Sequence, residues 1–157
     1  MKTLVLGLGN PILGDDGVGL VVVDRLRPLL ENRPDVELGE DYWGGLRLME
    51  RLVGFDRAII IDAIVSGQPV GTVLTLSPGS VPTQRSSSSH DVNLSTALKL
   101  GRQTGSHLPS DENIKLIAIE AGDVYTFTEQ LSPEVEAAIP SAIQAALDAL
   151  DAEREAS

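Results

Sequence analysis

Residues 4–19, LVLGLGNPILGDDGVG, constrain this chain more than any other stretch. The apolar run at residues 4–6 is typical of a strand that is covered on both faces. The glycines and the Asn-Pro pair within residues 7–14 indicate a turn. Asp15 and Asp16 then stand where a helix begins, and there the helix dipole and the unpaired N–H groups favour negative charge. An acidic pair after an interior strand is a candidate site of chemistry.

Two nucleotide-binding loops fail on this stretch. A dinucleotide-binding loop requires G-x-G-x-x-G, but counting from Gly7 places Ile12 at the third glycine position, and the acidic pair would repel a pyrophosphate. A Walker loop requires Gly-Lys-Ser/Thr, which does not follow these glycines. Helix capping explains one carboxylate of the pair and leaves the other for a different role.

Charge and cysteine usage exclude several classes of function. The 157 residues suit one domain with a real core. The net charge of −11, from 23 acidic and 12 basic residues, argues against nucleic acid as a partner. The absence of cysteine rules out disulfides, zinc–thiolate sites and a cysteine nucleophile. No apolar run reaches the length of a membrane span and no signal pattern opens the chain, so we expect a cytoplasmic protein with no membrane partner.

Apolar periodicity and turn residues divide the chain into alternating strands and helices, which indicates an α/β sandwich with a mostly parallel sheet. Residues 71–76 alternate like a strand near an edge of that sheet, residues 39–45 read as a loop, and Pro28 and Pro140 are expected to end or bend their helices. The predicted strands are 4–6, 36–38, 57–62, 71–76 and 114–119, and the predicted helices are 18–31, 46–53, 91–102 and 132–150.

Three polar residues fall where ligand sites gather in open α/β sheets, beyond the carboxyl ends of the strands. Asp16 follows the first strand, Asp62 closes an isoleucine-rich strand, and His90 precedes the third predicted helix. Two carboxylates and an imidazole suit a divalent metal with coordination positions left for water or substrate. A strand end for Asp62 and a loop position for His90 are the structural alternatives. His107 lies in a polar loop, and we expect it to be exposed.

A serine run before His90 raises a second chemistry, a Ser-His-Asp nucleophile built from Ser89, His90 and an aspartate. Nothing here resembles the G-x-S-x-G turn, and adjacent residues rarely aim at one point. The pattern disfavours this reading.

The motifs GNPILGDDGVG, IIIDAI and SHDVNL, in this order and spacing, resemble those of the hydrogenase maturation proteases. These endopeptidases remove a C-terminal extension from the large subunit of nickel–iron hydrogenases. The resemblance runs from Met1 to about Leu150. It implies one domain over residues 1–150, a three-layer α/β/α sandwich of the phosphorylase/hydrolase type with a mixed, mostly parallel five-stranded sheet. Residues 151–157, which follow the last predicted helix, are expected to form a frayed tail.

The resemblance also implies that Asp16, Asp62 and His90 occupy the family's metal-ligand positions. The metal would be nickel carried by the hydrogenase large-subunit precursor, which the site recognises, and zinc or cadmium can take such a site in vitro. No HExxH motif of a zinc protease is present, in agreement with this role. Of the acidic pair, Asp16 is expected to bind the metal. Asp15 is expected to stand at the start of the helix or to support the metal ligands without touching the metal. Whether a carboxylate or the metal activates the attacking water stays open.

One loop departs from the family pattern. Many members carry Asp-Gly-Gly-Thr after the second strand, whereas this chain has Glu40-Asp41-Tyr42-Trp43 before two glycines. Glu40 and Asp41 are therefore candidates for a loop that selects the substrate, and the identity of the hydrogenase stays open.

Two further functions compete with this one. Peptidyl-tRNA hydrolases also open with a strand and GLGNP, but they continue with an Arg-His-Asn element where this chain has Gly14-Asp15-Asp16, and the charge of −11 does not suit tRNA. A non-catalytic maturation chaperone for a nickel enzyme is the other alternative.

Overall fold

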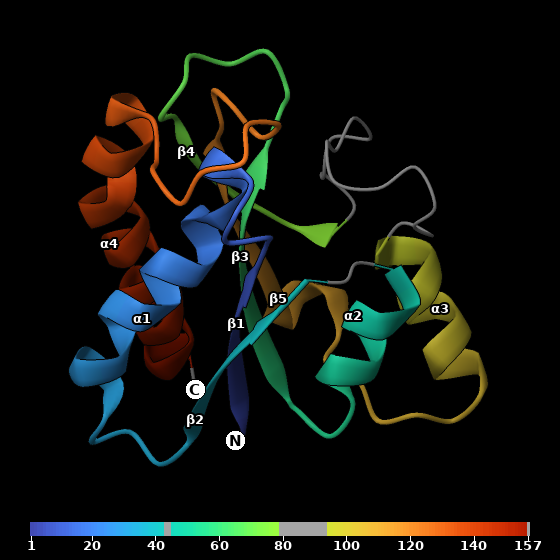
Figure 1. Ribbon diagram of the computed structural model, residues 1–157. Coiled ribbons are helices and arrows are strands. Elements are labelled where there is room, and N and C mark those ends of the chain that lie inside the picture. Colours follow the sequence, from blue (N-terminus) through green and yellow to red (C-terminus); the bar gives the residue numbers. More distant parts are fainter. Residues whose placement is uncertain (43–44, 79–93, 157) are drawn as a thin grey trace.

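The computed structural model describes residues 1–42, 45–78 and 94–156, and Figure 1 shows its three layers. A five-stranded sheet lies between helices α1 and α4 on one face and α2 and α3 on the other. The strands are β1 (Thr3–Leu8), β2 (Val36–Asp41), β3 (Arg57–Ile64), β4 (Val73–Leu76) and β5 (Ile114–Glu120). The helices are η1 (Gly14–Gly17), α1 (Val18–Leu30), α2 (Gly45–Leu52), α3 (Leu94–Gln103), η3 (Asp111–Asn113) and α4 (Pro133–Ala156).

The strand order is β2-β1-β3-β5-β4, and only the pairing of β4 with β5 is antiparallel among these strands. This arrangement confirms the predicted mixed, mostly parallel sheet and the edge position of residues 71–76. Every residue of β1 and β3 is buried, as expected for interior strands covered by helices on both faces. The carboxyl ends of β1, β3 and β5 consequently open on one end of the molecule, at the top of Figure 1.

Side-chain alternation along the strands builds a separate core on each face of the sheet. Val5, Ile59 and Ile61 pack with α1 and α4. Leu6 and Ile60 point the other way and pack with α2 and α3. Even-numbered residues of β3 therefore face α2 and α3, and this places Asp62 on that side of the sheet.

Helix α1 approaches the sheet closely because Gly19 carries no side chain. A Cβ atom at this position would lie 2.3 Å from the carbonyl oxygen of Ile61 and 2.7 Å from that of Leu8. Gly7 on β1 meets the same helix, since its Cβ would lie 2.5 Å from the carbonyl oxygen of Gly19. The glycines of the opening motif thus set the distance between the helix and the two strands that carry the candidate site.

We expect Gly19→Ala to lower the free energy of unfolding by roughly 2 kcal/mol, because backbone atoms cannot move aside cheaply for a new methyl group. Gly101→Ala in α3 is the matched control, since its Cβ would meet the flexible ends of Leu108 and Met49. Alanine also favours a helix over glycine by about 1 kcal/mol. Urea unfolding of both variants checks the difference, and an equal effect at the two positions would contradict this account.

Several element boundaries differ from the sequence prediction. β2 continues to Asp41, through residues expected to form a loop, because Gly39 to Asp41 pair with residues 6–8 of β1. Pro28 lies inside α1, which ends two residues later at Leu30, and Pro140 does not interrupt α4. α4 extends to Ala156 rather than ending near Leu150. The segment after Leu150 is rich in alanine, glutamate and arginine, which favour helix.

Candidate active site

Asp16 lies in η1, directly beyond the carboxyl end of β1, and only 5% of its surface is exposed. Its Oδ2 atom accepts a hydrogen bond of 2.8 Å from the backbone N–H of Asn10. The turn before it requires Gly9, whose φ is +145° and whose Cβ would lie 1.9 Å from the carbonyl oxygen of Asp16. The glycine-rich turn predicted from the sequence therefore folds back on Asp16 and fixes its carboxylate.

Asp15 is fully buried and points to a different part of the molecule, the connection between β5 and α4. Its Oδ2 accepts hydrogen bonds from the N–H groups of Gly122 and Asp123, at 2.8 and 3.0 Å, and from the Ser132 hydroxyl at 2.7 Å. Its Oδ1 accepts one from the N–H of Ser132 at 2.6 Å. Burial alone would raise the pKa of Asp15, but the bonds from Ser132, Asp123 and Gly122 outweigh it and lower the pKa below its ordinary value.

These bonds separate the two carboxylates by role. Asp15 joins the β5–α4 connection to η1, and η1 carries Asp16. The sequence predicts a supporting role for Asp15 but not its partners, because Ser132 stands only where the last predicted helix, residues 132–150, begins. α4 does begin at Pro133 directly after Ser132, and the N–H of Glu136 bonds to the Ser132 carbonyl at 2.9 Å.

Asp62 lies near the carboxyl end of β3, where it is 6% exposed, on the face covered by α2 and α3. η1 contacts β3, and Gly19 brings the start of α1 against Ile61, the neighbour of Asp62. The structure thus brings together the elements that carry Asp16 and Asp62. Both side chains are thus buried at the end of the sheet where ligand sites of α/β proteins gather.

His90 and Ser89 lie in residues 79–93, outside the described part of the chain. The described chain resumes at Leu94, where α3 begins, and Leu94 packs in the core on the side of the sheet to which Asp62 points. Across residues 1–42, 45–78 and 94–156, no group of three or more histidine, cysteine, aspartate or glutamate residues is placed to hold a metal. His90, the predicted third ligand, lies outside these ranges.

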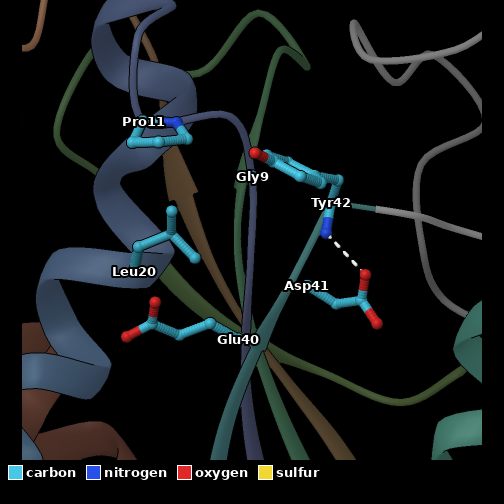
Figure 2. A pocket seen from close by; sticks show the side chains of 6 residues that line it. All are labelled: Gly9, Pro11, Leu20, Glu40, Asp41 and Tyr42. Atoms are coloured by element: carbon cyan, nitrogen blue, oxygen red, sulfur yellow. Dashed lines mark hydrogen bonds between the residues drawn. The ribbon is translucent and has the colours of Figure 1, made fainter.

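A hollow of about 280 Å³ lies beside the η1 turn and is lined by Gly9, Pro11, Leu20, Glu40, Asp41 and Tyr42. Figure 2 shows Glu40 on the side of Leu20 and Asp41 on the opposite side of β2. Glu40 pairs with Arg27 at 3.2 Å, and Asp41 lies 3.7 Å from Arg51 and accepts the N–H of Tyr42 at 2.8 Å. The stretch that departs from the family pattern, residues 40–42 at the end of β2, therefore forms one wall of a hollow next to the Asp16 turn.

The sequence did not single out a fourth buried acid at this end of the sheet, besides Asp15, Asp16 and Asp62. Glu120, the last residue of β5, is 2% exposed and accepts hydrogen bonds from the N–H and the hydroxyl of Ser66. These bonds hold the start of the β3–β4 connection. Its position at a strand end was the only signal in the sequence. His107 is exposed as predicted and pairs with Asp56 at 3.2 Å.

Comparisons with known proteins agree with this fold. The family model described as hydrogenase maturation protease matches residues 21–149. The hydrogenase 2 maturation protease of Escherichia coli K12 is 31% identical over 153 residues, which cover 96% of this chain and 91% of that protein. The solved hydrogenase-maturating endopeptidase HybD of E. coli superposes with a TM-score of 0.77 at 30% identity, over 98% of this chain and 94% of that one. HybD of Thermococcus kodakarensis gives 0.63 at 29% identity, over 94% and 98%.

The molecule is therefore a peptidase on an α/β/α sandwich. It belongs to the hydrogenase maturation protease family. This result sets aside peptidyl-tRNA hydrolase and a non-catalytic chaperone. In the part of the chain that the structure describes, no helix has the length and apolar character needed to cross a membrane.

Proposed function

We propose that this peptidase removes the C-terminal extension of a nickel–iron hydrogenase large-subunit precursor after nickel has been inserted. In this proposal Asp16, Asp62 and His90 recognise the nickel that the precursor carries. The observation that carries it is the pair of buried carboxylates on η1 and β3, two elements in contact at the carboxyl end of the sheet. Carboxylate oxygens of this kind are ligands that divalent metals accept in proteins.

The donor set suits nickel. Carboxylate oxygens and an imidazole nitrogen bind borderline divalent metals and leave coordination positions for groups of the precursor. The Asn10 N–H bond orients the Asp16 carboxylate, as bonds to the outer atoms of a ligand do in metal sites. His90 stands four residues before the start of α3, a helix that covers the face of Asp62, so its place in the chain supports its role as the third ligand.

The proposed reaction is hydrolysis of one peptide bond near the nickel. Docking of the nickel on the three side chains holds the scissile peptide beside the site, and such positioning supplies a large share of a rate enhancement. A carboxylate then acts as the general base for the attacking water, or the metal polarises the water or the carbonyl. Both routes use the same residues.

The hollow beside Asp16 is proposed to take the precursor segment next to the cleaved bond. Glu40 and Asp41 supply its acidic wall and Leu20 its apolar wall. Because this wall replaces the family's Asp-Gly-Gly-Thr stretch, it is the place where this peptidase selects its hydrogenase.

The proposal predicts that cleavage depends on the nickel in the precursor. Large-subunit precursors of the same organism, prepared with and without nickel, are incubated with the protein. The masses of the precursor and of any product are then measured by mass spectrometry. We expect a product shortened at its C-terminus from the nickel-loaded form only. Equal cleavage of both forms would overturn nickel recognition, and an intact nickel-loaded precursor would overturn the proposed substrate.

A further inference from the structure

Aromatic side chains are rare in this chain, and most of those that the structure describes are exposed. The sequence holds five, and the structure describes four of them. Phe55 is buried, whereas Tyr42, Tyr125 and Phe127 are 63%, 78% and 82% exposed. A chain with so few aromatic residues builds its core almost without them, so the exposed rings need another explanation.

Tyr125 and Phe127 stand on the β5–α4 connection, residues 121–132, which we call the aromatic loop. The loop is held in place by its hydrogen bonds to Asp15 and by a short parallel bridge between Thr128 and Leu13. Within it, Asp123 Oδ1 accepts the N–H groups of Tyr125 and Thr126 at 2.9 and 3.1 Å. The rings are thus exposed on a fixed backbone rather than on a loop without internal bonds.

The bridge also places a third apolar side chain beside the rings. The N–H of Thr128 bonds to the carbonyl of Ile12, and the N–H of Gly14 bonds to the carbonyl of Thr128, both at 2.9 Å. Ile12, which is 48% exposed, and Phe127 therefore occupy neighbouring positions of the bridge. In Figure 1 the loop, in orange, runs beside the η1 segment, in blue. The surface formed by Ile12, Tyr125 and Phe127 is continuous through the backbone with the turn that carries Asp16.

The surroundings of this surface are acidic. The sequence has no lysine, arginine or histidine in the aromatic loop, and it has none between Lys2 and Arg25, the segment that carries Ile12. Glu129 and Asp123 lie on the aromatic loop itself. A partner that covers this surface must therefore bring apolar groups to the rings and basic groups to the border, since complementary potentials favour the encounter.

We propose that Ile12, Tyr125 and Phe127 form the docking surface for the folded body of the hydrogenase large-subunit precursor, on an apolar patch bordered by lysine and arginine. This inference rests on the proposed function, because it names the same substrate. Rigid aromatic side chains serve as anchors in protein interfaces, and a fixed backbone lowers the entropy lost on binding. The anchors hold the precursor while its nickel and its C-terminal segment reach Asp16.

The test is the double variant Tyr125→Ser/Phe127→Ser. The affinity of this variant for the nickel-loaded precursor is measured by surface plasmon resonance. The rate at which it cleaves the precursor is measured by steady-state kinetics. We expect the Kd and the KM to rise about 30-fold, equivalent to about 2 kcal/mol, and kcat to stay within about twofold. Leu29→Ser and Leu100→Ser, two exposed apolar residues outside the loop, are the matched controls and should change neither constant.

The outcomes separate the two proposals. If the wild type cleaves the precursor and the double variant keeps its Kd and KM, the docking surface is wrong and the proposed function stands. If kcat falls while KM is unchanged, the rings act on the site rather than on docking, and the inference is also wrong. If the wild type neither binds nor cleaves the precursor, the proposed function fails and takes this inference with it.

Discussion

Asp62→Asn is expected to slow cleavage of the nickel-loaded precursor by about 100-fold or more, because the neutral amide is a far weaker ligand and cannot act as a base. The same change should alter the free energy of unfolding by less than about 1 kcal/mol. Asparagine keeps the size of the buried side chain, so the substitution creates neither a cavity nor an overpacked contact. Loss of activity without loss of stability is the result that marks a functional carboxylate.

Cleavage is followed by mass spectrometry at several precursor concentrations, and stability by urea unfolding at pH 7. Asp16→Asn should behave in the same way, since both carboxylates are proposed to meet the same nickel. Binding of Ni²⁺ alone to the wild type and to each variant, measured by calorimetry, separates metal contact from catalysis. A stable Asp62→Asn variant that cleaves at the wild-type rate would remove Asp62 from the site.

The fold was predictable because the strongest local signals lie in the buried parts. The isoleucine run of β3 and the apolar start of β1 reveal strands that need cover on both faces, and only a layered α/β fold supplies it. The end of β2 was not predictable. Gly39, Glu40 and Asp41 have low strand propensity, and only their pairing with β1, a contact between distant residues, extends the strand.

The candidate site was likewise predictable only where local sequence determines it. Asp16 follows β1 and Asp62 lies near the carboxyl end of β3. Because α/β sheets place their ligands at such strand ends, the local pattern predicted that both residues lie at this edge of the sheet. The partners of Asp15 did not follow from this pattern, because Gly122 and Ser132 lie more than a hundred residues away along the chain. Sequence spacing carries no record of such a contact. The position of Phe127 beside Ile12 was not predictable for a similar reason, since it depends on the bridge between Thr128 and Leu13.

Asp15→Asn should lower the free energy of unfolding by roughly 3 kcal/mol at pH 7, in contrast to Asp62→Asn. The carboxylate of Asp15 accepts bonds at both oxygens, all from N–H or O–H donors. Whichever way the amide of asparagine turns, its NH₂ group faces a donor, and buried charge-assisted bonds are lost. The aromatic loop and η1 would then lose their common anchor, so a fall in cleavage should accompany the loss of stability.

The loss of unfolding free energy caused by Asp15→Asn should be smaller at low pH than at neutral pH. The pKa of Asp15 is lowered in the folded protein, whereas the unfolded chain titrates near about 3.9, so the unfolded state binds more protons between the two values. The stability that this carboxylate contributes is therefore fully present above the unfolded pKa and is lost as the pH falls through the folded one. The difference in the free energy of unfolding between the wild type and Asp15→Asn should be constant above about pH 5 and should decrease below about pH 4.

Asp56→Asn is the matched control for this prediction. The pKa of Asp56 is also lowered, first by the backbone N–H of Lys2 and then by His107, but its carboxylate is exposed to solvent. Water replaces its lost bonds, so its removal should leave the urea midpoint almost unchanged. If Asp15→Asn proved as mild as Asp56→Asn at every pH, the bonds from Gly122, Asp123 and Ser132 would not anchor the loop. The supporting role of Asp15 would then fail, while the role of its neighbour Asp16 would still be decided by cleavage of the precursor.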